Sequence, residues 1–175
     1  MTGLPSTRRA TWILTGALLF FLAAVAPAAE VTANKGIFAK GKLYGGVTGG
    51  YISTSGDNYL MLGLGLGYLL ADGFAVGLDY ETWLVGSPTV NKLAPWVGYT
   101  FWKMQKVKPY VAAFYRQNWV SGFDDYQDIG ARAGVYMPRG RSYLGFGIVY
   151  EYRLDADGFY DRSQFYPEIR FAVGF

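Results

Sequence analysis

Residues 59–70 read YLMLGLGLGYLL, and this stretch decides the fold. Its large apolar residues stand at every second position, and glycines fill most of the positions between them. A β-strand places successive side chains on opposite faces, so one face of this segment is rich in leucine and the other is nearly bare. A helix would spread the leucines around its circumference and would carry three interior glycines at roughly 1 kcal/mol each. The stretch therefore predicts a strand.

The same period of two recurs along the chain after residue 41. Turn-forming sequences separate the alternating segments, among them ADG at residues 71–73 and PRGR at residues 138–141. The segments expected as strands are residues 42–53, 60–70, 74–84, 93–102, 111–116, 128–137, 143–153 and 165–175. The sequence therefore predicts an all-β protein, an eight-stranded antiparallel up-and-down β-barrel.

Two residue types are missing from the composition. The chain has no cysteine and no histidine, which excludes disulfides, thiolate metal sites and every mechanism that needs an imidazole. Aromatic residues reach 18% and charged residues only 17%, which is an unusual balance for a soluble domain. We therefore expect no metal, no cofactor and no nucleic-acid partner.

The first residues form a separate segment. Arg8 and Arg9 precede an apolar run that extends to about Val25, and small residues follow at Ala26, Ala28 and Ala29. This arrangement is typical of a cleaved secretory signal peptide, and the alternative is a membrane-anchor helix, for which the run is short. The sequence predicts a signal peptide over residues 1–29, a short periplasmic segment over residues 30–41 and the barrel over residues 42–175.

The polar face of the strands decides which face meets water. In a soluble, lipocalin-like barrel that face would be solvated and rich in Lys, Glu, Thr and Ser, whereas here it carries mainly glycines, aromatics and charges of both signs. Glycine weakens a strand unless something must approach it closely, and the interior of an eight-stranded barrel is that crowded. The sequence thus predicts a transmembrane barrel whose apolar face contacts lipid.

The charged residues give an expected topology with both termini in the periplasm. Lys92 and Arg162 are expected in external loops, and Lys103, Lys106 and Lys108 in a periplasmic turn. The remaining strand charges are expected to form an ion-pair network inside the lumen: Asp79, Glu81, Arg116, Asp128, Arg132, Glu151, Arg153, Glu168 and Arg170. Because proline removes a ladder hydrogen bond, Pro95, Pro109 and Pro167 are expected near the rims.

The last segment, FYPEIRFAVGF at residues 165–175, alternates up to its final aromatic residue. Ile169, Phe171, Val173 and Phe175 resemble the C-terminal assembly signal of bacterial outer-membrane barrels. The region 42–175 as a whole resembles the small eight-stranded barrels of the OmpX/Ail and OmpA transmembrane type, and GGVTGGYISTSG at residues 45–56 looks like a first strand of the OmpX group.

This resemblance implies a monomeric integral protein of the bacterial outer membrane, in contact with membrane lipids and lipopolysaccharide and inserted by the barrel-assembly machinery. Its loops are shorter than those with which OmpX/Ail proteins adhere. The expected function is a non-enzymatic structural or surface-interaction role with a lumen filled by side chains. The alternative is an OmpW-like channel for small or hydrophobic solutes. Outer-membrane enzymes that modify lipid A use a histidine, which this chain lacks.

Overall fold

The computed structural model describes residues 36–54, 57–84, 88–104, 106–154 and 162–175. The expected signal peptide lies outside these residues. A short 3-10 helix, η1 (Gly36–Phe38), precedes eight strands. Their bounds are β1 (Leu43–Thr54), β2 (Asp57–Ala71), β3 (Phe74–Trp83), β4 (Val90–Thr100), β5 (Lys108–Val120), β6 (Tyr126–Arg139), β7 (Ser142–Arg153) and β8 (Ser163–Gly174).

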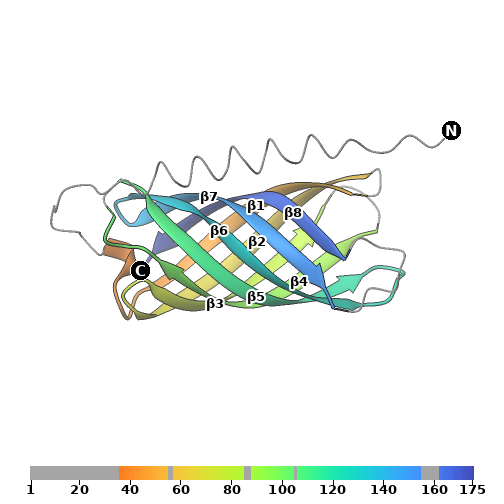
Figure 1. Cartoon of the computed structure of the whole chain (residues 1–175), viewed down its shortest axis with the longest axis horizontal. Helices are drawn as coiled ribbons and strands as arrows, with labels where there is room; N and C mark the ends of the chain where they lie inside the picture. Colours follow the sequence, from red (N-terminus) through yellow and green to blue (C-terminus); the bar gives the residue numbers. More distant parts are fainter. Residues whose placement is uncertain (1–35, 55–56, 85–87, 105, 155–161) are drawn as a thin grey trace. The chain divides into compact units, whose positions relative to one another are not determined.

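The eight strands form one closed, antiparallel, up-and-down barrel, as the sequence predicts (Figure 1). Each strand pairs with the next, and β8 closes the barrel against β1 from Tyr44↔Gly174 to Gly50↔Glu168. Closure leaves no free strand edge. The short connections at residues 72–73, 101–107 and 140–141 lie at the same end as η1 and the C-terminus, and we call this the turn end. The opposite end is the loop end.

The alternation of the sequence becomes an alternation between the outside of the wall and the lumen. Leu64 and Leu66 of β2 are 64% and 61% exposed, whereas Met61 and Leu69 of the same strand are buried. Glycine on the lumen face makes room for large side chains: a Cβ on Gly77 would lie 2.4 Å from the Trp96 ring. The barrel therefore has an apolar outer surface and a lumen packed with side chains.

The prolines correct one expectation. Pro109 is the second residue of β5, near the rim as predicted, and it pairs with Val135 of β6. Pro167 is the fifth residue of β8; it lies one residue beyond the last β1–β8 pair and pairs with Ile148 of β7. The rim placement of Pro95 was wrong, because this residue lies midway along β4. The β4–β5 ladder passes from Leu93↔Gln117 to Trp96↔Phe114 and leaves Pro95 unpaired there, so its missing N–H costs no ladder bond.

Candidate functional site

The lumen holds the charged side chains, and one group of them surrounds Arg116 of β5. Its guanidinium contacts Glu81 of β3 at 2.9 Å (Nη2 to Oε1) and forms a second ion pair with Glu151 of β7. The same guanidinium donates to the Tyr166 hydroxyl at 2.8 Å, and that hydroxyl donates to Glu151 at 2.5 Å. Arg116 is 0% exposed, so its charge depends on these partners and not on water.

A second group surrounds Asp79 of β3. Its Oδ2 lies 2.8 Å from Arg132 Nη1 of β6 and 2.8 Å from Arg170 Nη2 of β8. Both arginines also reach Glu168 Oε2, each at 3.4 Å. The other oxygen of Asp79 accepts the indole N–H of Trp96 at 3.1 Å. Asp79 and Glu168 therefore share two cations, and neither carboxylate depends on only one arginine.

Phe114 of β5 joins the two groups. The guanidinium carbons of Arg116 and Arg132 lie 4.6 Å and 4.9 Å from the centroid of its ring. Arginine is attracted to an aromatic face at such distances, and the attraction is stronger where water is excluded. The two groups thus form one continuous plug of charged and aromatic side chains.

Two predicted members lie apart from these groups, nearer the loop end. Asp128 is buried and accepts a hydrogen bond from Asn118 Nδ2 at 2.9 Å. Arg153, its neighbour across the β6–β7 pair, lies over the ring of Tyr126, with 3.6 Å between guanidinium carbon and centroid. The structure therefore gathers the seven other predicted residues and leaves this pair outside.

Lys92 was wrongly placed in an external loop. It belongs to β4, is fully buried, and its Nζ lies 3.4 Å from Glu151 Oε2 and 4.4 Å from the Trp83 ring centroid. The expected strand began at Leu93, three residues after the observed start of β4 at Val90, although Lys92 shares the two-residue period of Ala94 and Trp96. We define the lumen network as Lys92, Arg116, Arg132 and Arg170 with Asp79, Glu81, Glu151 and Glu168, four basic and four acidic residues.

An aromatic layer fills the lumen between this network and the turn end. It consists of Phe38, Tyr44, Trp96, Tyr110, Tyr136 and Tyr143. The rings of Tyr110 and Tyr136 stack at 4.0 Å, and Phe38 of η1 lies 5.9 Å from Tyr136 and 5.7 Å from Tyr143. The Phe38 carbonyl accepts the N–H of Gly73 at 2.8 Å, so η1 is bonded to the β2–β3 turn.

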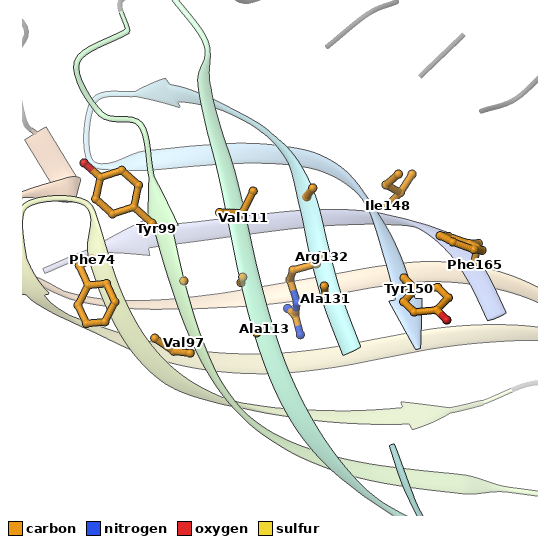
Figure 2. Close-up of a pocket in the computed structure, with 13 residues that line it drawn as sticks. Phe74, Val97, Tyr99, Val111, Ala113, Ala131, Arg132, Ile148, Tyr150 and Phe165 are labelled. Carbon is orange, nitrogen blue, oxygen red and sulfur yellow. The ribbon is translucent and has the colours of Figure 1, made fainter. Parts of the chain in front are cut away.

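A small cavity lies between side chains of these two layers. It lies beside Asp79, Arg170 and Tyr143 and has a volume of about 10 Å³, which suits one water molecule at most. Two larger hollows, of about 500 Å³ and about 780 Å³, involve the outside of the wall, and in the first of them Ala113 and Ala131 sit among larger apolar side chains (Figure 2).

Within residues 36–175, leaving out the undescribed gaps, no cluster of three or more Asp or Glu side chains is arranged to hold a metal ion. No helix among the described residues is long and apolar enough to cross a membrane.

The residues that resemble an assembly signal all lie on β8 or directly after it. Ile169, Phe171 and Phe175 point outward and are exposed, and Val173 is half-buried next to Gly45 of β1. Recognition of this strand by an assembly machinery stays a prediction.

Three solved structures share this architecture at low sequence identity. The N-terminal β-barrel domain of Pseudomonas aeruginosa OprF superimposes with a TM-score of 0.61 at 15% identity, covering 78% of this chain and 98% of that one. Neisserial surface protein A (NspA) gives 0.55 at 17% identity, covering 76% and 94%. The outer membrane protein OprG from Pseudomonas aeruginosa gives 0.51 at 14% identity, covering 81% and 98%. No family model and no curated protein matches the sequence.

The chain therefore has the fold of the small eight-stranded outer-membrane β-barrels. At such identities the likeness concerns the fold alone, since one fold serves many functions.

Proposed function

We propose that this protein is a small, non-enzymatic, integral β-barrel of the bacterial outer membrane, with a structural or surface-interaction role and a closed lumen. The observation that carries the proposal is that the barrel exposes apolar side chains on its outside and buries charged side chains inside, the reverse of a soluble protein. Leucines such as Leu64 face outward, while charged residues such as Arg116 and Glu81 are buried inside. Water would favour the reverse, and lipid requires this arrangement in a closed barrel.

The contents of the lumen support the proposal that it is closed. The lumen network places opposite charges in direct contact, and the aromatic layer with Phe38 lies between this network and the turn end. Paired charges of this kind bind each other in preference to lining a water path, because their attraction is strong where water is excluded. The proposal includes export by the signal peptide, periplasmic termini, a monomeric state and insertion by the assembly machinery.

Planar-bilayer recording of the refolded protein tests the closed lumen. We expect little or no steady conductance from the folded protein. Its resistance to unfolding in cold detergent verifies that the sample is folded. A matched variant with Arg116, Glu81 and Phe38 all changed to alanine removes part of both layers, and we expect it to be leaky if it folds. Stable channels from the wild-type protein would contradict the closed lumen and support the solute channel.

Cell fractionation tests the membrane placement. We expect the mature protein in the outer-membrane fraction and resistant to extraction by alkaline carbonate. Recovery of folded barrel from the soluble fraction without detergent would contradict the proposal.

A further inference from the structure

The turn end of the barrel carries an excess of exposed positive charge. Six basic side chains are exposed there: Lys40, Lys42, Lys103, Lys106, Arg139 and Arg141. Among the described residues at this end Asp72 is the one acidic side chain, and one of its carboxylate oxygens accepts the backbone N–H of Lys40 at 2.9 Å. None of the six cations belongs to the lumen network.

Part of the connection between β4 and β5 is bonded to Lys108, the first residue of β5, whose side chain points inward. Lys108 is buried, and its Nζ donates to the carbonyls of Trp102 at 2.5 Å and Met104 at 2.7 Å. The N–H of Phe101 donates to the carbonyl of Pro109 at 2.8 Å. Lys103 and Lys106, the two lysines of this connection, are exposed at the surface.

Aromatic residues lie between these lysines and the apolar wall. Tyr99 and Phe101 point outward and meet edge to face, with 5.2 Å between ring centroids. Lys103 Nζ lies 5.6 Å from the centroid of the Trp102 ring. Along this side of the wall the order is therefore apolar residues, aromatic rings and then cations. A lipid leaflet presents acyl chains, interface and phosphates in that same order.

A second basic turn adjoins the first. Since β5 pairs with β6, the β6–β7 turn is the next one around the rim, and it carries Arg139 and Arg141, both exposed. The two turns together present four cations along one arc of the rim.

We propose that this arc, formed by Lys103, Lys106, Arg139 and Arg141, binds the phosphate groups of anionic phospholipids in the leaflet at the turn end. The inference rests on the membrane placement proposed above. The aromatic pair beside the lysines favours a lipid over a soluble anion, because the rings contact the interface while the cations contact phosphate. The even number of strands puts the turn end on the side of the termini, which is the periplasmic leaflet, and so favours phospholipid over lipid A.

The test is native mass spectrometry of the barrel released from vesicles that contain equal amounts of phosphatidylglycerol and phosphatidylcholine. We expect the wild-type protein to retain phosphatidylglycerol selectively. Near a membrane surface each lysine changes the binding of anionic lipid by a factor of about 5 at low ionic strength, so the double change Lys103→Gln with Lys106→Gln lowers the selectivity by up to about 30-fold.

Two matched variants complete the experiment. The double change Lys103→Arg with Lys106→Arg keeps the charge and should keep the selectivity, and Arg162→Gln removes one exposed cation from the loop end and should leave it unchanged. Undiminished selectivity in the glutamine variant, or an equal loss in Arg162→Gln, would overturn the proposal. A repeat with vesicles that contain equal amounts of phosphatidylglycerol and lipid A tests the choice of lipid, and a preference for lipid A through the same lysines would overturn the choice of phospholipid. Failure of the membrane placement would be seen separately, as a barrel that does not insert into the vesicles.

Discussion

Leu64 and Gly65 are neighbours in β2, yet they belong to two different environments. Leu64 is 64% exposed on the outer wall, whereas a Cβ on Gly65 would lie 2.4 Å from Asp79 Oδ1 inside the lumen. The outer face tolerates many apolar side chains, because lipid is fluid and adapts to their shape. The lumen face is a set of specific contacts in a fixed volume. The comparison teaches that the same strand should tolerate substitution on one face and not on the other.

The largest expected effect lies on the lumen face, at Arg116. Among the described residues it is the one salt-bridge partner of Glu81, so Arg116→Met leaves a buried carboxylate without a cation in direct contact. Breaking such a pair from one side costs about 3–5 kcal/mol. The free energy of unfolding, from urea titration of the barrel in lipid vesicles, measures the loss.

Arg132→Met is the matched control for this change. Asp79 and Glu168 both keep Arg170 when Arg132 is removed, so we expect a smaller loss than for Arg116→Met. Equal losses in the two variants would show that individual pairs do not matter and that the lumen responds only to its total charge.

The next effect tests the outer face. Leu64→Arg places a cation midway along β2, where lipid is expected, and an arginine at mid-bilayer costs roughly 2–4 kcal/mol. Leu64→Met keeps the site apolar and should change the free energy of unfolding very little. Normal folding of the arginine variant in vesicles would contradict the assignment of this face to lipid.

Gly65→Leu tests the lumen side of the same strand. Asp79 is held by Arg132, Arg170 and Trp96, so it cannot move aside freely for a new side chain. Overpacking of this kind costs about 1–3 kcal/mol. Gly49→Leu in β1 is the control, because a Cβ there meets nothing closer than 4.0 Å. We expect slower folding and lower stability for Gly65→Leu alone, and comparable losses in both variants would remove the distinction between the faces.

The sequence predicted the fold well because alternation is a local property. The expected strand at residues 128–137 lies within β6 (Tyr126–Arg139), and every outward leucine of β2 was assigned to the correct face. Alternation also placed Asp79, Arg116 and Arg170 on the lumen face without any knowledge of their partners.

The partners themselves could not be predicted from the sequence. Arg170 donates to Asp79 across 91 positions of the chain, and nothing local specifies which side chains meet across a closed barrel. Lys92 was missed because the strand was begun at Leu93. Phe38 was missed because a three-residue 3-10 helix has no periodicity to detect, although its ring contributes to the aromatic layer. Contacts inside the lumen can thus be assigned only from the closed three-dimensional barrel, because the strand pattern does not specify which side chains meet there.

The smallest expected effect separates the aromatic layer from the lumen network. Tyr110 contributes a ring that stacks on Tyr136 at 4.0 Å and a hydroxyl that donates to Glu168 at the long distance of 3.4 Å. Tyr110→Phe removes only the hydroxyl, and Glu168 keeps both of its arginines. A typical hydrogen bond contributes about 0.5–1.5 kcal/mol, and the length of this one places the expected loss at the lower end.

Tyr110→Leu removes the stacked ring as well and should cost more in the same urea titration, because stacked aromatic pairs add to the burial of area. The order of losses we expect is therefore Tyr110→Phe, then Tyr110→Leu, then Arg116→Met. If Tyr110→Phe were as damaging as Arg116→Met, the hydroxyl would be part of the ionic network, and the lumen would be one cooperative unit in place of two layers.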